Sequence, residues 1–101
     1  MTPSEHLRLA AALIADEKRW TQKATARSAD GKLCSAKSQS ARQWCAIGGV
    51  IKVSQDRGSS FAAYKFKEVY GHNLSSVNDH NGHAYTIGAM MHVADKLDGL
   101  A

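Results

Sequence analysis

Residues 83–97, HAYTIGAMMHVADKL, carry the strongest structural pattern in the chain. The small and apolar side chains of this segment recur every three or four positions: Ala84, Ile87, Gly88, Met90, Met91, Ala94 and Leu97. This spacing places them on one face of an α-helix, which we expect to begin at residue 83 or 84 and to end at residue 97. The segment therefore predicts a mainly α-helical protein.

Three further helices are expected upstream of this segment. Residues 2–5 (TPSE) fit a capping box with proline at the first helical position, and they start a helix that we expect to end near Trp20. A second helix is predicted from residue 40 or 41 to about residue 54, and a third fits residues 60–70. The polar residues 72–83 are expected to form a loop with one short turn.

The residues between the first two helices lack helical periodicity. Residues 21–27 are polar, and Asp30-Gly31 is a typical hairpin turn, so residues 32–34 can return as a second short strand. An isolated two-stranded ribbon is only marginally stable, so we expect this hairpin to pack against the helices. We therefore predict one compact domain over residues 1–101, mainly α, with about four helices and room for a short β-hairpin after the first helix.

The composition excludes several classes of protein. The chain has 101 residues, of which 44% are hydrophobic and 22% charged, and these values exclude a wholly disordered chain. No apolar stretch approaches the roughly 20 residues of a membrane span. Residues 1–5 lack the pattern of a secretory signal, so we expect a cytoplasmic protein in which Cys34 and Cys45 stay unpaired.

The charges are unevenly distributed along the chain, whose net charge is +4. Residues 18–67 hold eleven Lys and Arg against two Asp, a net charge of +9, and the remaining residues carry −5. Such a basic segment is suited to binding nucleic acid or an acidic protein surface. The alternative interpretation is a solvent-exposed helix face with half-buried aromatic rings and no polyanion partner. The candidate binding residues are Arg42, Lys52, Arg57, Phe61, Tyr64, Lys65 and Lys67.

One cysteine permits an enzymatic interpretation. Cys45 lies in the first turns of the expected second helix, where the helix dipole lowers the pKa of a thiol. His83 or His80 could act as its base, with Asn78 or Asp79 as the residue that orients the imidazole. The competing interpretation is a small buried cysteine that lets helices approach each other. We favour the second interpretation and expect no catalysis.

The histidines suggest a metal site only weakly. His72, His80 and His83 lie close in sequence, and Cys34 or Cys45 could complete a ligand set. The chain has neither a Cys-x-x-Cys pair nor the His-x-x-x-His spacing of a helical metal site, so we expect no metal and no cofactor. We expect the pair Asn78-Asp79 to serve the structure, by capping the last helix or binding loop amides.

Four segments together match a known pattern: residues 13–22 (LIADEKRWTQ), 26–31 (ARSADG), 44–48 (WCAIG) and 78–79 (ND) before the last helix. In these segments the chain resembles an uncharacterised small-domain family found in bacterial and phage genomes. Members usually carry a basic residue a few positions after Asn-Asp, where this chain has His83. The resemblance implies one compact domain without established activity, and it suggests a phage or mobile-element setting.

Together these patterns predict a small non-catalytic binding protein. It is expected to engage a macromolecular partner, a protein or nucleoprotein, through its basic central face. In a phage-type setting that partner would be a host nucleoprotein or defence complex that the protein inhibits. The alternatives are a small cysteine hydrolase using Cys45 with His83, a nucleic-acid-binding helical module, and a homo-oligomer that packs Ile87, Met90 and Met91 between subunits. No membrane partner is expected.

Overall fold

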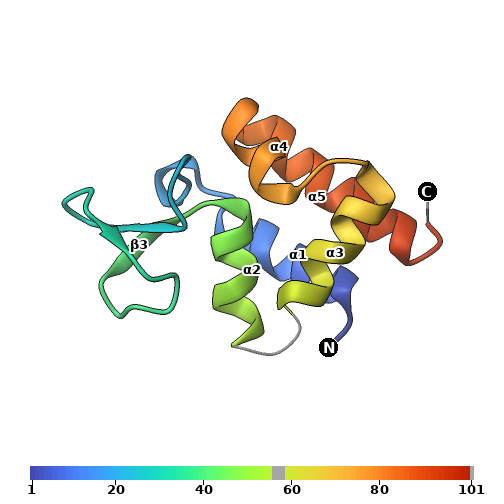
Figure 1. Ribbon diagram of the computed structural model, residues 1–101, viewed down its shortest axis with the longest axis horizontal. Coiled ribbons are helices and arrows are strands. Elements are labelled where there is room, and N and C mark those ends of the chain that lie inside the picture. The colour runs from blue at the N-terminus through green and yellow to red at the C-terminus, as the bar shows by residue number, and fades with distance from the viewer. Residues whose placement is uncertain (56–58, 101) are drawn as a thin grey trace.

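The computed structural model describes residues 1–55 and 59–100. Within these residues, five α-helices form a bundle and a small sheet projects from one end of it (Figure 1). The helices are α1 (Pro3–Leu13), α2 (Ala46–Ser54), α3 (Ser59–Tyr70), α4 (Leu74–His80) and α5 (His83–Leu97), with a 3-10 turn, η1 (Glu17–Arg19). The strands are β1 (Ala26–Ser28), β2 (Leu33–Cys34) and β3 (Ala41–Trp44). The mainly α-helical prediction is confirmed, with five helices instead of about four.

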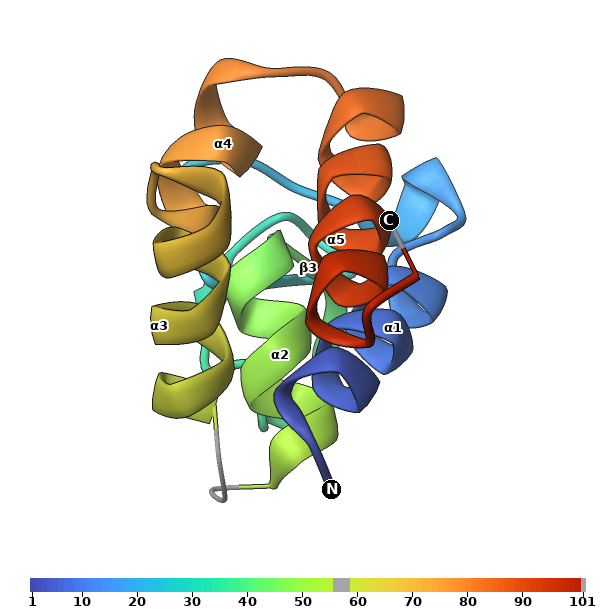
Figure 2. The ribbon, with the colours of Figure 1, turned by 90° about the vertical axis from the view of Figure 1, so that its right-hand side faces the viewer.

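The hydrophobic core lies between α1 and its neighbours α2, α3 and α5. Figure 2 shows α2 between α1 and α3, with α5 beside α1. Each of these helices buries at least one large side chain completely: Leu7 of α1, Val50 of α2, Phe66 of α3 and Met90 of α5, together with Ile14, the C-cap of α1. Because burying one such side chain stabilises a fold by roughly 1.5–3 kcal/mol, this cluster holds the bundle together.

Two adjacent glycines let α2 approach its neighbours closely. A Cβ atom on Gly48 would lie 1.9 Å from the carbonyl oxygen of Thr25, which precedes β1. A Cβ atom on Gly49 would lie 3.4 Å from the Cβ of Ala10 in α1. Glycine at position 48 therefore makes room for the chain entering the sheet.

α5 begins at His83 and ends at Leu97, as its periodicity predicted. Met90 is fully buried in the core, Ile87 is half-buried and Met91 is 36% exposed. The stripe of Ile87, Met90 and Met91 therefore cannot pack between subunits as a whole, because Met90 belongs to the core of its own chain. In the part of the chain that the structure describes, no helix combines the length and apolar character needed to cross a bilayer.

The sheet is antiparallel, with strand order β2-β1-β3. β1 and β2 form the predicted hairpin, and Gly31 in its turn has φ +83°, which favours glycine. On its other side β1 pairs with β3, so that Ala26 lies opposite Trp44. The third strand and the helices behind it give this short hairpin the support that an isolated ribbon lacks.

Residues 41–44 form the strand β3, so their assignment to the second helix is wrong. Ala41 and Trp44 are buried while Arg42 between them is exposed, and all four residues have strand geometry. Cys45 then caps α2: its backbone is extended, and its Sγ accepts a hydrogen bond from the Gly48 N–H at 3.2 Å. The helical spacing from Trp44 onward concealed this boundary.

α1 ends at Leu13, well before the end expected near Trp20. Asp16 starts a separate turn, because its carboxylate accepts a hydrogen bond from the Lys18 N–H at 3.0 Å and so caps η1. Trp20 then continues in extended conformation and forms a parallel bridge with Trp44 of β3. In the acidic pair after α1, Asp16 is therefore a cap and Glu17 begins η1, so the pair does not continue the helix.

α4 replaces most of the loop that was expected between α3 and α5. It buries Leu74, Val77 and Asn78 along one side. The expected turn at residues 74–77 is the first part of this helix. Its polar composition concealed it, because only two of its seven residues are large and apolar.

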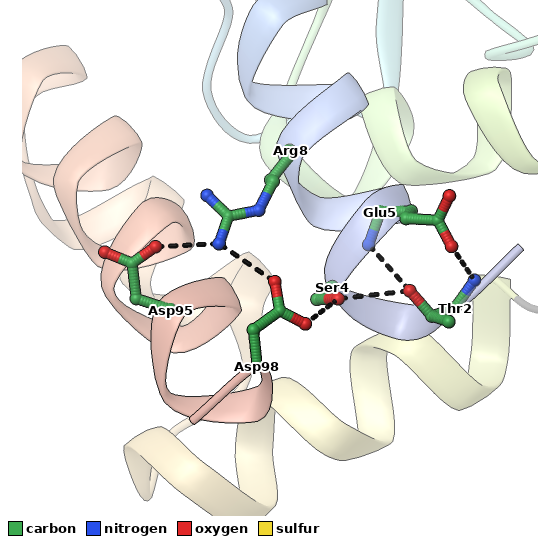
Figure 3. Close-up of polar contacts among 6 residues, drawn as sticks. All are labelled: Thr2, Ser4, Glu5, Arg8, Asp95 and Asp98. Atoms are coloured by element: carbon green, nitrogen blue, oxygen red, sulfur yellow. Dashed lines mark hydrogen bonds and ion pairs between the residues drawn. The ribbon is translucent and has the colours of Figure 1, made fainter. Parts of the chain in front are cut away.

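A polar clasp joins the start of α1 to the end of α5 (Figure 3). The guanidinium of Arg8 donates to the carboxylates of Asp95 at 2.7 Å and Asp98 at 3.0 Å. The hydroxyl of Ser4 donates to the other oxygen of Asp98 at 2.6 Å. The predicted capping box at residues 2–5 is formed beside it.

Candidate functional site

Three cationic side chains from three elements line one open hollow beside the sheet. Arg19 comes from η1, Arg42 from β3 and Lys52 from α2. The hollow has a volume of about 310 Å³. Its remaining lining residues are Ser38, Gln39, Ala41 and Trp44. We call the space that these seven residues enclose the basic hollow.

The contacts between η1 and β3 explain why these cations converge. The Thr21 N–H donates to the Trp44 carbonyl at 3.1 Å, and the Gln43 side chain donates to the Lys18 carbonyl at 3.3 Å. These bonds hold η1 and its Arg19 against β3. α2 follows β3 after Cys45 alone, and its Lys52 lines the same hollow.

Arg42 is held in place by its own backbone surroundings. Its Nη1 donates to the carbonyl oxygens of Gln39 and Ala41, both at 2.8 Å. The Ser38 and Ser40 hydroxyls are hydrogen-bonded at 2.7 Å in the preceding turn. Since both carbonyl bonds come from Nη1, the Nε and Nη2 groups are left for a ligand.

Among the residues that the structure describes, none supplies a counter-charge to the basic hollow. No carboxylate is among its described lining residues. Across residues 1–55 and 59–100, no carboxylate forms an ion pair with Arg19, Arg42 or Lys52. Converging cations without a partner carboxylate create a positive potential that an anionic ligand would neutralise.

Four of the predicted binding residues lie on α3 and do not line the basic hollow. Phe61 and Tyr64 are 52% and 60% exposed, and Lys67 is also exposed. Lys65 forms an ion pair with Glu68 at 3.2 Å and lies 5.6 Å from the centre of the Phe61 ring. In Figure 1, α2 lies between the sheet and α3. The cations of the hollow and the exposed aromatic rings therefore occupy separate surfaces.

The structure thus brings together only part of the predicted binding face. Arg42 and Lys52 share the basic hollow, whereas Arg57 lies outside the described residues. Arg19 completes the hollow, although it was not among the predicted binding residues. The sequence signal for Arg19 was its position directly before Trp20. Its place beside β3 depends on the turn η1, which the sequence did not predict.

Asn78 joins the sheet to the helices. It is fully buried, and its Oδ1 accepts from the Trp20 indole at 2.7 Å and from the Ala46 N–H at the start of α2 at 2.9 Å. Its Nδ2 donates to the Thr21 carbonyl at 3.1 Å and to the Asp79 carboxylate at 3.0 Å. One amide therefore connects η1, α2 and α4.

Gln22 and Asp79 reinforce this junction. The Gln22 side chain donates to the carbonyls of Asn78 at 2.9 Å and Asn81 at 2.8 Å. The Asp79 carboxylate accepts from the Lys23 N–H at 2.8 Å, where Lys23 has φ +62°. Asn78-Asp79 binds loop amides as expected, but no contact of either side chain caps the last helix, whose N-cap is Gly82.

The surroundings of Cys45 do not activate its thiol. Burial raises the pKa of Cys45, against a smaller lowering by the Gly48 N–H, so the expected lowering by the helix dipole is wrong in direction. The hollow that Cys45 lines includes Asp79 but not His83. The Nε2 of His83 instead donates to the Ile14 carbonyl at 2.6 Å.

Two histidines, His72 and His80, line a hollow of about 320 Å³ beside α3, α4 and α5. The hydroxyls of Tyr70 and Tyr85 are hydrogen-bonded there, and this bond raises the pKa of Tyr70. The Nδ1 of His80 donates to the Ser76 carbonyl at 2.9 Å. Over the described ranges, no three His, Cys, Asp or Glu side chains lie together as metal ligands.

One family profile matches nearly the whole chain, residues 1–99. The chain belongs to DUF6197, a family of unknown function. No curated protein and no solved structure matches this DUF6197 chain significantly. The family resemblance expected from the sequence is therefore confirmed.

Three of the segments that carry the resemblance meet in space in this DUF6197 protein. Residues 13–22 contribute Trp20 and its neighbours, residues 44–48 contribute the start of α2, and residues 78–79 contribute the amide that joins them. These segments form the junction between sheet and bundle. They position the elements that line the basic hollow, and Arg19 and Trp44 belong to both.

Proposed function

We propose that this protein is a non-catalytic binding protein that engages an anionic macromolecular partner, a protein or nucleoprotein, through the basic hollow. The observation that carries the proposal is the convergence of Arg19, Arg42 and Lys52 in one hollow whose described lining holds no carboxylate. Guanidinium and ammonium groups keep their charge at neutral pH, so they attract an anion without transferring protons. Arg42 is also held ready by two backbone carbonyls.

The family resemblance suggests the setting of this binding. A small basic protein from a phage or mobile element can compete with a host nucleoprotein or defence complex for the polyanion that this complex binds. The basic hollow is of the right chemistry for such competition. The inhibited complex is part of the proposal and is identified by the polyanion that it holds.

Matched charge-reversal variants test the proposal. Arg42→Glu/Lys52→Glu removes two cations of the hollow, and Lys67→Glu/Lys96→Glu changes the net charge equally on α3 and α5. Binding to heparin, poly-glutamate and duplex DNA is measured by fluorescence anisotropy at about 50 mM salt, where polyanion contacts are strong. Circular dichroism verifies that both variants are folded.

The proposal expects at least one of these polymers to bind the wild type and the control variant but not the hollow variant. It fails if none of the three binds, or if the control variant loses as much affinity as the hollow variant.

A further inference from the structure

We propose that the partner is a nucleoprotein and that the part bound is its double-stranded nucleic acid, whose sugar-phosphate backbone lies in the basic hollow while its bases go unread. This inference rests on the proposed function and specifies its partner. It follows from the hydrogen-bond donors that line the hollow and from the lack of an exposed aromatic ring among its described lining residues.

The lining of the hollow supplies hydrogen-bond donors for phosphate oxygens. Arg19 and Arg42 supply guanidinium N–H groups, Lys52 an ammonium, and Ser38 and Gln39 a hydroxyl and an amide. The guanidinium group of arginine can donate two parallel hydrogen bonds to the oxygens of one phosphate. Contacts with the nucleic-acid backbone position a protein on the duplex but carry no sequence information. The chemistry of the hollow is therefore that of phosphate binding.

The described lining of the hollow offers no aromatic ring to an unpaired base. Trp44 is only 7% exposed, and its indole already donates to the Ala36 carbonyl at 2.9 Å. The exposed rings Phe61 and Tyr64 belong to α3 and do not line the hollow. Proteins that bind single strands stack successive bases on such rings, so the hollow favours a duplex, whose bases are already stacked.

A protein partner fits the hollow less well. Protein interfaces centre on exposed apolar or aromatic residues surrounded by a polar rim. The apolar lining residues are Ala41 and Trp44, which are 3% and 7% exposed. With its apolar residues buried, the hollow presents mainly polar donors, which suits a phosphate backbone better than an acidic peptide.

Arg42 extends the surface beyond the basic hollow. It also lines an open hollow of about 540 Å³ along the hairpin, together with Ser28, Lys32 and Ser40. Asp30 is the carboxylate in that lining, and it lies 3.8 Å from the Lys32 ammonium. We expect the backbone to follow the sheet across Arg42 and to pass Asp30, whose charge opposes binding.

The test measures the anisotropy of a labelled 20-base-pair DNA at two salt concentrations. If three phosphates are neutralised, raising the salt from 50 to 200 mM weakens binding about 40-fold. Lys52→Gln removes one contact and should lower this factor to about 12-fold, whereas the control Lys67→Gln should leave it unchanged. Two duplexes of unrelated sequence should bind equally, and Asp30→Asn should tighten binding about two- to fivefold.

Other outcomes overturn the inference. A preference for one sequence, tighter binding of the single strand, or no effect of Asp30→Asn contradicts backbone binding along this path. If poly-glutamate binds through Arg42 and Lys52 and the duplex does not, the inference fails while the proposed function stands. If no polyanion binds, both fail.

Discussion

Asn78 and Gly48 show how single residues define the junction between sheet and bundle. The side chain of Asn78 donates twice and accepts twice, and all four bonds cross between different segments or to its neighbour Asp79. At Gly48 the Thr25 backbone approaches α2 so closely that a Cβ atom would collide with it. One residue supplies directional bonds and the other supplies space, so each tolerates few replacements.

Gly48→Ala is expected to destabilise the protein by about 3 kcal/mol, at the upper end for overpacking, because the new Cβ meets the Thr25 backbone and not a flexible side chain. Gly88→Ala is the control, since a Cβ there meets nothing within 4 Å and alanine favours a helix by about 1 kcal/mol. Urea unfolding measures both. Equal stabilities of the two variants would contradict the close approach of Thr25 to α2.

Cys45 is expected to react far more slowly than Cys34, which is only half-buried. Burial keeps Cys45 in its unreactive thiol form, so labelling by iodoacetamide should be slower by on the order of tenfold or more. Mass spectrometry of the labelled peptides measures both rates, and labelling in urea verifies that both sites can react. Fast labelling of Cys45 in the folded protein would instead support the cysteine-hydrolase alternative.

At the scale of elements, periodicity predicted the helices that have a continuous apolar stripe. α3 and α5 lie where their spacing indicated, and the hairpin lies at Asp30-Gly31. β3 was missed because four residues contain too little alternation to compete with the helical spacing that follows Trp44. α4 was missed because its buried face includes the polar Asn78, whose burial depends on partners far away in sequence.

The same limitation affected the candidate site. Arg42 and Lys52 could be selected from the basic segment, but their pairing with Arg19 depends on η1 lying against β3. Local sequence does not encode that contact. It also does not encode the separation of the α3 aromatic rings from the hollow, which arises from the position of α2 between them.

The clasp between α1 and α5 is expected to weaken in acid. Hydrogen bonds from Ser4 and Arg8 hold the pKa of Asp98 below its ordinary value of 3.8. A carboxylate with a lowered pKa stabilises the fold above its ordinary pKa, and this stabilisation is lost as the pH falls through the lowered value. The melting temperature should therefore change little between about pH 8 and pH 5 and should fall below about pH 4.

Asp98→Asn tests this clasp. The variant should melt at a lower temperature than the wild type at neutral pH, and the difference should shrink in acid. Glu17→Gln, which removes an exposed carboxylate outside the clasp, should leave the acid response unchanged. An acid response of Asp98→Asn that equals that of the wild type would show that the clasp contributes nothing.

At the scale of the whole molecule, the cations of the basic hollow and the carboxylates of the clasp lie far apart. Arg19 and Arg42 belong to the sheet side of the molecule, whereas the end of α5 that carries Asp95 and Asp98 lies at the opposite side of the bundle (Figure 1). Separated charges of opposite sign orient a protein toward a polyanion before contact, and salt screens the effect over about 8–10 Å. The end of α5 would thus turn away from the partner proposed for the hollow.

Sheet and bundle are expected to unfold together, because Asn78 and Gln22 connect them. Both tryptophans, Trp20 and Trp44, lie in the sheet region, so their fluorescence reports on the sheet, while circular dichroism at 222 nm reports on the helices. The two urea transitions of the wild type should coincide, as in a two-state protein. Asn78→Ala leaves the Trp20 indole and the Ala46 N–H without their acceptor, at a cost of about 3 kcal/mol.

In Asn78→Ala, the fluorescence transition should move to lower urea than the helical transition, because the sheet loses its main connection to the bundle. Asn73→Ala is the control, since the Asn73 side chain is exposed and forms no capping bond at the start of α4. Two separate transitions in the wild type would show that the sheet folds independently. A single transition in Asn78→Ala would assign the coupling to packing around Trp44 and Gly48, in which case Gly48→Ala should separate the two signals instead.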